Sequence, residues 1–374
     1  MDWGGAPDIV RITCAYLNPD FYDITLISGP TRYPSTKTKE FLGQSGQKTI
    51  IIPELKRKIN PISDLAALVR LYFLFRRQHF DIVHTHTAKA GALGRTAAFL
   101  AGKSKIVHTL HGHNFYGYSS AFFSKIIAVI EKIIASFTTK IIALTELEKK
   151  DLIRFKVTGA EKIRLIYSGL ELDRYAQINI DKAKIKQNFN IAPDENIVGM
   201  AGRLEPIKGP QYFVQAAGNV AKHFTKVKFI MVGEGSLRPR LERQAKEAGL
   251  ENKFIFTGWR EDMPEILSIL DILVLPSLNE AVGMVLIEAQ ALGVPIVAAK
   301  VGGIPEILVD NQTGILVPPA DPYRLAQAIN QLLLDEQKRR DMAEAARISV
   351  RDKFKAQDMV DRISDLYQEL ISGK

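Results

Sequence analysis

Two glutamates, Glu280 and Glu288, stand eight residues apart in the segment 275–289, LPSLNEAVGMVLIEA. An apolar strand end precedes them, and Gly283 lies just before an apolar helical run. If the helix begins near Gly283, Glu280 lies in the loop and Glu288 more than one turn inside the helix. The unpaired N–H groups of the helix start would lie between the carboxylates and suit a phosphate. The spacing fits a nucleotide-sugar, with hydroxyls at both ends of a diphosphate, or else an ordinary strand–loop–helix with solvated glutamates.

A second segment, 202–209 (GRLEPIKG), carries two cations between an expected strand and an expected helix. Arg203 would present a forked guanidinium and Lys208 a point charge to an anion at that strand end. A surface turn with two solvated cations is the other interpretation. Because several strand ends of this half carry such features, the sequence favours an anion site there.

Two further strand ends carry weaker signals. The segment 233–235 (GEG) follows one strand, where two glycines could simply permit a tight turn. The segment 257–260 (TGWR) follows another strand, where backbone groups could pair with the edge of a base. Trp259 and Arg260 would then adjoin the base. Packing of Trp259 in the core is the other interpretation.

Short apolar, β-branched runs alternate with helical patterns along the first half, which predicts a parallel sheet with helices on both faces. The expected strands are residues 23–27, 49–52, 81–84, 105–109 and 140–144, with a last strand and turn at 164–172. The expected helices are residues 63–78, 91–101, 124–137 and 146–155.

The second half repeats this alternation and predicts a second domain of the same plan. Its expected strands are residues 197–201, 227–232, 254–257, 271–275, 295–299 and 315–317. Its expected helices are residues 211–223, 237–248, 284–292 and 322–334, followed by two helical stretches in 336–371. The polar residues 173–195 are interpreted as the connection between the domains, with a short helix.

Histidines stand where two expected strands of the first half end. His84 and His86 belong to one strand end, and His111 and His113 follow another. Ligands of parallel α/β folds gather at the carboxyl ends of strands. Each imidazole is therefore either a site residue or a satisfied histidine of the core, and the core is favoured for His84, which lies within its strand.

Length and composition describe a globular protein of two domains. The chain has 374 residues, of which 46% are hydrophobic and 24% charged. No run approaches the roughly 20 apolar residues of a membrane-spanning helix, and the first residues do not resemble a signal peptide. Cys14 is the single cysteine, which excludes an internal disulfide. The expected compartment is the cytoplasm.

The excess of positive over negative charge lies in the first half. The net charge is +9, and residues 1–172 hold 24 Lys and Arg against 14 Asp and Glu. Aromatic residues from Phe115 onward precede an apolar helical stripe that ends near Phe137. Together these features predict peripheral contact with an anionic membrane, unless the aromatics pack in the core and the cations are merely solvated. Nucleic acid is disfavoured as a partner, because the basic half lacks an aromatic-and-basic stacking pattern.

Six segments of the second half together resemble the nucleotide-binding domain of retaining glycosyltransferases of family 4: GRLEPIKG, VGEGSLRPRLE, FTGWRED, LPSLNEAVGMVLIEA, GGIPEIL and NQTGILVPP. HTHTAKAGALGRTAA, IVHTLHGHNFYGY, KIIALTELEKKDL and YSGLELDRY extend the resemblance to the first half. It implies the GT-B fold of two facing Rossmann-like domains. Residues 1–172 would bind the acceptor, 173–195 would be a linker, 196–352 would bind the nucleotide-sugar, and the helix in 353–374 would return to the first domain.

The resemblance also implies roles for the donor-site residues. Arg203 and Lys208 would hold the diphosphate and stabilise the leaving group. Glu288 would accept from ribose hydroxyls, and Glu280 would contact the transferred sugar. His111 matches the histidine that faces the reacting sugar from the first domain. Further expected donor contacts are Gly4, Gly5, Trp259, Arg260, Gly283 and Met284.

The implied reaction is transfer of a sugar, with retention, from a nucleoside diphosphate sugar (expected to be a UDP-sugar) to a hydroxyl group. The segments of the first half resemble those of bacterial surface-polysaccharide enzymes, which implies a saccharide or lipid-linked acceptor. The chain has no D-x-D triplet, and Arg203 and Lys208 can supply the positive charge, so no metal or other cofactor is expected. A nucleotide-sugar epimerase of the same fold and a non-catalytic nucleotide-sugar-binding partner are the alternatives.

One strand of the expected first sheet has no counterpart in the sequence. The segment 2–6 (DWGGA) resembles the glycine-rich loop that follows the first strand in this family, and only Met1 precedes it. That strand is central in a doubly wound sheet, with neighbours on both sides. The strands near 23–27 and 81–84 are therefore expected to lack their shared neighbour. The corresponding hypothesis is a truncated chain or a misassigned start, and the alternative is that the sheet closes over the gap.

Overall fold

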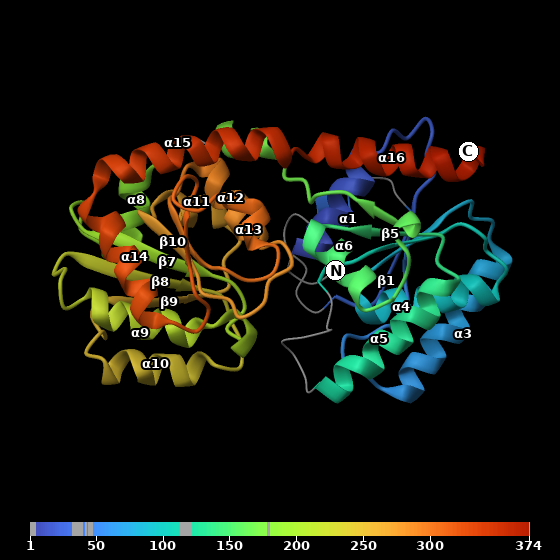
Figure 1. Cartoon of the computed structure of the whole chain (residues 1–374), viewed down its shortest axis with the longest axis horizontal. Coiled ribbons are helices and arrows are strands. Elements are labelled where there is room, and N and C mark those ends of the chain that lie inside the picture. Colours follow the sequence, from blue (N-terminus) through green and yellow to red (C-terminus); the bar gives the residue numbers. More distant parts are fainter. Residues whose placement is uncertain are drawn as a thin grey trace. The chain divides into compact units, whose positions relative to one another are not determined.

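The computed structural model of the chain describes residues 5–31, 40, 41, 43, 48–112, 121–177 and 180–373. It divides into two compact units, drawn in Figure 1. Unit 1 comprises Met1–Gly169 and Ala356–Lys374, and unit 2 comprises Leu170–Lys355. Residues 173–195, interpreted from the sequence as a connection, lie within unit 2, where two short helices pack against its other helices.

The strands of unit 1 form two separate parallel sheets among the described residues. They are β1 (Thr25–Ser28), β2 (Lys48–Ile51), β3 (Val83–His86), β4 (Ile106–Thr109), β5 (Lys140–Ala143) and β6 (Ile163–Leu165). β1 pairs with β2, and β3, β4, β5 and β6 pair in that order. The two strands expected to lack a shared neighbour, β1 and β3, therefore each end a sheet, as the sequence predicted.

The helices of unit 1 are α1 (Gly5–Tyr16), α3 (Pro61–Arg77), α4 (Ala88–Leu100), α5 (Ala121–Ser136), α6 (Glu146–Arg154) and α16 (Ala356–Ser372). Among them, side-chain capping is seen at the starts of α3 and α6. The Asn60 side chain caps α3 and Pro61 occupies its first position, which needs no N–H donor. Helix α1 was not predicted. Its first residue, Gly5, was expected in a loop, and Gly4 lies outside the described residues.

The C-terminal helix α16 belongs to unit 1, in agreement with the resemblance. Its buried residues follow a helical period and form one apolar stripe. Tyr367 from this stripe packs edge-on against Tyr22 and His84. At the exposed side, the Glu369 carboxylate pairs with Arg164 of β6. The helix thus contacts both the described start of unit 1 and its second sheet.

Unit 2 contains a single six-stranded sheet of parallel strands in the order β12-β11-β10-β7-β8-β9. The strands are β7 (Asn196–Ala201), β8 (Val227–Val232), β9 (Phe254–Gly258), β10 (Ile272–Leu275), β11 (Ile296–Ala299) and β12 (Ile315–Val317). The chain runs outward from β7 to β9 and then returns to β10 on the other side of β7. The strand order reverses between β7 and β10, the position where parallel α/β sheets bind ligands.

Helices cover the sheet of unit 2, as expected for buried parallel strands. They are α7 (Leu172–Gln177), α8 (Lys182–Asn188), α9 (Pro210–Val220), α10 (Arg238–Glu247), α11 (Met263–Ser268), α12 (Met284–Leu292), α13 (Ile304–Ile307), α14 (Pro322–Leu334) and α15 (Glu336–Lys353). Short 3₁₀ helices occur at Pro206–Lys208 in unit 2 and at Ala160–Lys162 in unit 1.

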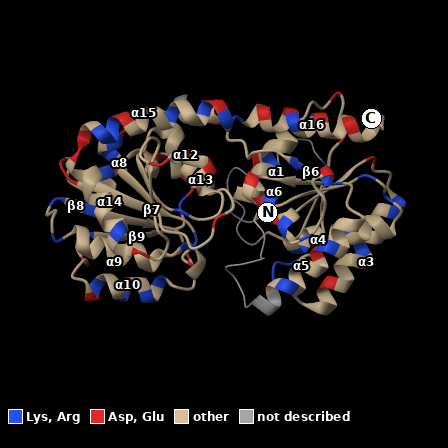
Figure 2. Ribbon diagram, viewed as in Figure 1, with Lys and Arg blue, Asp and Glu red and all other residues tan. Residues whose placement is uncertain are grey.

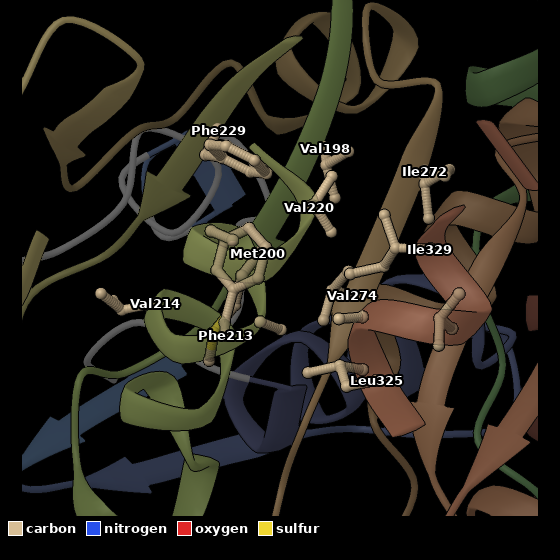
Figure 3. Packing of buried hydrophobic residues seen from close by; sticks show 14 of the residues in the cluster. Val198, Met200, Phe213, Val214, Val220, Phe229, Ile272, Val274, Leu325 and Ile329 are labelled. Atoms are coloured by element: carbon tan, nitrogen blue, oxygen red, sulfur yellow. The ribbon is translucent and has the colours of Figure 1, made fainter. Parts of the chain in front are cut away.

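The core of unit 2 lies where α9 and α14 pack on the central strands (Figure 3). Phe213 of α9 is fully buried and approaches Phe229 of β8 edge-on at 6.1 Å between ring centroids. Met200 of β7 and Ile329 of α14 are likewise fully buried. This packing fixes β7, at whose end the cationic segment 202–209 begins.

Replacement of Phe213 by alanine should lower the free energy of unfolding by about 3–5 kcal/mol, because it removes a fully buried aromatic side chain and leaves a cavity. Urea denaturation followed by circular dichroism measures the change. Tyr323→Ala is the matched control, because Tyr323 is 63% exposed and its loss should change stability by no more than about 0.5 kcal/mol. Equal effects of the two variants would contradict the packing.

Candidate functional site

The residues predicted to bind an anion flank the point where the strand order of unit 2 reverses. Arg203 and Lys208 follow β7, and Glu280 follows the neighbouring strand β10. Because both strands are parallel, their following segments meet at the same edge of the sheet. The structure therefore brings to one edge of the sheet three residues that are up to 77 positions apart in the printed sequence.

Glycines let these segments approach one another at van der Waals distance. Gly209 has a φ of +64°, and a Cβ atom there would lie 2.1 Å from the carbonyl oxygen of Pro276. Gly302, after β11, has a φ of +53°, and its Cβ would lie 1.8 Å from the carbonyl oxygen of Glu280. A side chain at either position would be strained by its backbone and would clash. Backbone contacts thus fix Glu280 from two sides.

The closest charged contact of the site joins Lys208 Nζ and Glu280 Oε2. Both side chains are largely shielded from solvent, at 19% and 11% exposure. The Ser277 hydroxyl donates a second hydrogen bond to Glu280 Oε2 at 3.2 Å. The ammonium group is therefore held at the sheet edge by a carboxylate and can be shared with an incoming anion.

Arg203 provides a second cation, which is not paired with a carboxylate of any described residue. Its guanidinium makes no hydrogen bond or ion pair with any residue that the structure describes. An anion at this edge would meet one paired and one unpaired cation, a combination that binds diphosphate oxygens well. Over the described ranges, no group of three or more His, Cys, Asp or Glu side chains could hold a metal ion.

The start of α12 provides backbone donors beside these cations. Gly283 is the N-cap with a φ of +72° and a ψ of +64°, and Met284 is the first helical residue. The first N–H groups of a helix have no partner within the helix, and the dipole favours an anion there. Glu288 lies one turn further along α12 and is partly buried. The arrangement agrees with the one derived from the spacing of the two glutamates.

The segment 259–262 follows β9, the outermost strand on one side of the sheet, which lies two strands from β7. Trp259 is 48% exposed, so the interpretation of Trp259 as a core residue is wrong. Arg260 forms a two-pronged ion pair with Asp262 and lies over the ring of Phe189 at 5.7 Å. The guanidinium of Arg260 is therefore committed to neighbours in unit 2, whereas Trp259 presents its ring to solvent.

Three of the histidines predicted in unit 1 form a connected group. His84 Nε2 lies 2.7 Å from the Thr109 hydroxyl, and its Nδ1 lies 2.5 Å from the Tyr367 hydroxyl. The rings of His84 and His86 lie 4.3 Å apart, and His86 Nδ1 lies 3.1 Å from His111 Nε2. His84 is thus a satisfied histidine, as the alternative held, while His86 contacts His111 directly. His113 lies outside the described residues.

Burial keeps this group uncharged. Removal from water lowers the pKa of His84, His86 and His111 below the ordinary value of 6.5, and to about 4 for His86. The pKa of His84 and that of His111 are lowered further by mutual repulsion with His86. The neutral imidazoles can each donate one hydrogen bond and accept another.

Two residues near His111 were not identified from the sequence. His108, fully buried on β4, contacts the Thr85 hydroxyl at 3.0 Å. Glu148, buried on α6, accepts a hydrogen bond from the backbone N–H of Gly112. The pattern Thr145-x-x-Glu148 is that of a helix capping box and was the available signal for α6. It does not indicate which distant segment the carboxylate contacts.

Two family models match the chain, one on each half. "Glycosyltransferase Family 4" matches residues 3–174, and "Glycosyl transferases group 1" matches residues 181–349. The galactosyltransferase of Escherichia coli named UDP-Gal:alpha-D-GlcNAc-diphosphoundecaprenol alpha-1,3-galactosyltransferase is 31% identical over 94% of this chain and 90% of its own length. The capsular polysaccharide biosynthesis glycosyltransferase CapM of Staphylococcus aureus is 25% identical over 90% of this chain and 89% of its own.

A solved structure extends the similarity to the whole fold. Anabaena Alr3699/HepE, crystallised with UDP and glucose, is 25% identical, with a TM-score of 0.83 over 98% of this chain and 96% of its own. Two parallel-sheet units, with the charged site at the strand reversal of the second, make this chain a glycosyltransferase of GT-B architecture. It belongs to glycosyltransferase family 4.

The neutral histidines predict a loss of stability in acid. Their folded-state pKa lies below the unfolded value, so the unfolded chain binds protons first as pH falls. Their contribution is complete above pH 6.5 and is lost toward pH 4 for His86, on the order of 2–3 kcal/mol. Urea unfolding across this range should therefore show a shallower pH dependence for His86→Asn than for wild type. His79→Asn, at an exposed histidine, is the control, and an identical slope in all three proteins would contradict this account.

Proposed function

We propose that this glycosyltransferase moves a sugar, with retention, from UDP to a hydroxyl of a saccharide or lipid-linked acceptor. The observation that carries the proposal is the Lys208–Glu280 pair at the strand reversal, with Arg203 and the start of α12 beside it. The similarity to a protein crystallised with UDP and glucose supports the nucleotide. The E. coli relative, whose name specifies a UDP-sugar and a sugar diphosphate-lipid, supports the acceptor class.

The donor would bind across the edge of the unit 2 sheet. Lys208 would then pair with the diphosphate as well as with Glu280. The diphosphate would also pair with Arg203, which has no carboxylate partner among the described residues. Glu280, held by Ser277 and by backbone contacts, would then accept from hydroxyls of the transferred sugar. The Glu280 carboxylate would stay in place while it exchanges one hydrogen-bonding partner for another, so the site would need little reorganisation. Such a site favours catalysis by positioning of the reactants.

The remaining donor contacts would extend along the same edge. The N–H groups of Gly283 and Met284 would face the phosphate or sugar, and Glu288 would accept from the ribose hydroxyls. Trp259 would lie on the side of the base. Because Arg260 forms an ion pair with Asp262, we propose that it stabilises that segment and does not bind the phosphate.

The chemistry would proceed on one face of the sugar. Retaining glycosidases hold two carboxyl groups about 5–5.5 Å apart, with one acting as nucleophile. Here the carboxylate nearest the proposed sugar is paired with a lysine, so we propose that the departing phosphate takes the proton of the acceptor hydroxyl. Lys208 and Arg203 would stabilise the negative charge on the leaving group. His111, neutral through burial, would hydrogen-bond the reacting sugar from unit 1.

Site variants test this assignment. Lys208→Ala should lower turnover about 100-fold or more with a modest effect on UDP affinity, because its charge matters most as the leaving group forms. Glu288→Ala should weaken UDP binding about 10-fold through loss of hydroxyl contacts. His111→Ala should lower turnover without weakening UDP. UDP affinity is measured by calorimetry, and turnover by release of UDP in the presence of a lipid-diphosphate sugar, with and without EDTA.

Lys222→Ala and Glu251→Ala are the matched controls, because both side chains are exposed in unit 2 and neither belongs to the site segments. Unchanged turnover in all three site variants would refute the assignment. UDP binding without transfer to any acceptor would favour a non-catalytic binding partner. Isomerised sugar in the absence of acceptor would favour the epimerase, for which the relatives named above give no support.

We also propose that unit 1 contacts an anionic membrane. Helix α4 packs against both α3 and α5, and these three helices gather on one side of the unit in Figure 1. Helix α3 exposes a stripe of apolar side chains at helical spacing, and α5 exposes a second one. The exposed residues are Ile62, Leu65, Val69 and Phe73 on α3, and Ile126, Val129, Ile130 and Ile133 on α5.

The charge of the same region complements anionic headgroups (Figure 2). Residues 53–105 and 121–136 together hold 12 Lys and Arg and four Asp and Glu. Three of the four acids are already paired with Lys or Arg: Glu54 with Arg70, Asp64 with Lys89 and Glu131 with Arg95. Arg77 lies over the ring of the exposed Phe73 at 5.8 Å, which places a cation beside an apolar side chain. None of the described helices is both long enough and apolar enough to cross a membrane.

Liposome flotation tests the membrane surface. Binding should rise with the share of phosphatidylglycerol and fall with salt, because the attraction of cations is screened. Paired substitution of Ile62 and Leu65, or of Val129 and Ile133, by serine should reduce binding several-fold. Substitution of the exposed Leu334 and Ile348 of unit 2 by serine removes similar apolar area and should leave binding unchanged. No binding of wild type at low salt would end the proposal.

A further inference from the structure

A buried carboxylate outside the proposed site lies against the segment that carries His111. Glu148 is 3% exposed and stands at the third position of helix α6, whose N-cap is Thr145. The Thr145 hydroxyl accepts a hydrogen bond from the Glu148 N–H at 3.1 Å. In the usual capping box, the glutamate would reach back to the N-cap backbone. Here its carboxylate points to other groups instead.

The Glu148 carboxylate bridges two neighbouring strands beyond the point where both have ended. Oε1 accepts from the N–H of Gly112 at 3.0 Å, and Oε2 accepts from the N–H of Leu144 at 2.8 Å. Gly112 follows β4 by three positions, and Leu144 follows β5 directly. One side chain thus replaces a rung of backbone hydrogen bonds between the two segments.

His111 lies between two residues whose backbone N–H groups are held by hydrogen bonds. The N–H of Leu110, just before it, donates to the carbonyl of Ile142 at 3.1 Å. The N–H of Gly112, just after it, donates to Glu148. Gly112 has a φ of +94°, a conformation that favours glycine, so the chain turns sharply at this residue. The ring of His111 meets His86 at 3.1 Å, which sets its direction.

We propose that Glu148 is a positioning residue for His111. A carboxylate only accepts, and it accepts twice here, so it fits two backbone donors that no strand satisfies. Its charge lies in the first turn of α6, where the helix dipole stabilises it. Fixing Gly112 removes the freedom of the His111 backbone on one side. The ring then keeps one orientation toward its partner.

This inference rests on the proposed role of His111 and predicts which kinetic quantity changes. Loss of Glu148 should alter the placement of His111 in unit 1 and leave the donor residues of unit 2 untouched. Turnover should therefore fall while UDP affinity stays constant. A residue that only stabilises the fold would lower the melting temperature without separating these two quantities.

The experiment uses Glu148→Gln and Thr145→Ala in the full chain. The glutamine keeps the shape but offers one acceptor oxygen and turns its NH₂ group toward a backbone donor. Turnover of Glu148→Gln should fall about 10-fold or more, with the Kd for UDP within about twofold of wild type. Thr145→Ala removes the cap of the same helix without removing the Glu148 carboxylate and should keep most of the turnover. Equal loss of turnover in both variants, or none in Glu148→Gln, overturns the proposal.

A second measurement does not depend on transfer activity. Amide hydrogen exchange and ring-nitrogen NMR shifts report the Gly112 N–H and the His111 Nε2 atom directly. Glu148→Gln should accelerate exchange at Gly112 and shift the His111 signal, while Thr145→Ala should leave both near their wild-type values. Unchanged signals in Glu148→Gln overturn the inference even if the wild type transfers no sugar. A wild type without transfer but with the expected shifts contradicts only the proposed function.

Discussion

The ion pair between Lys208 and Glu280 is the contact on which the proposed donor site of unit 2 depends. It joins side chains 72 positions apart, from segments that follow the two strands where the sheet reverses its order. A largely buried pair contributes little net stability, because both charges lose water on folding. Its effect is to keep a cation at a fixed place beside Arg203. The pair therefore prepares the site for an anion without leaving Lys208 unpaired in its absence.

Backbone contacts, rather than side chains, bring this pair together. Gly209 fits against Pro276 and Gly302 fits against Glu280 only because neither carries a Cβ atom. The Leu278 N–H also donates to the carbonyl of Ile207 at 2.8 Å. The three segments after β7, β10 and β11 thus form one packed layer over the sheet edge. The core beneath, around Phe213 and Met200, holds the strands from which these segments start.

In unit 1 the corresponding group consists of neutral histidines rather than of charged side chains. Burial lowers the pKa of His84, His86 and His111, so hydrogen bonds rather than charges connect them. His84 links Thr109 of β4 to Tyr367 of α16, and His86 links β3 to His111. Glu148 is a buried carboxylate of this unit and accepts hydrogen bonds from the backbone N–H groups of Gly112 and Leu144. The charged group of unit 2 and the uncharged group of unit 1 are consistent with the proposed donor, which has a diphosphate, and the proposed acceptor, which has a hydroxyl.

The sequence by itself determined the alternation of strands and helices, because apolar runs and helical periods are local properties. It also placed Gly283 at a helix start between Glu280 and Glu288. Only the tertiary structure decided which side chains meet. Pairing of Lys208 with Glu280 and contact of Glu148 with Gly112 depend on strand order and on how the loops pack, because these residues are distant in the sequence. Helix α1 was missed because the segment around its first residue, Gly5, resembles a glycine-rich loop, whereas burial of Ile9 and Ile12 in unit 1 stabilises a helix there.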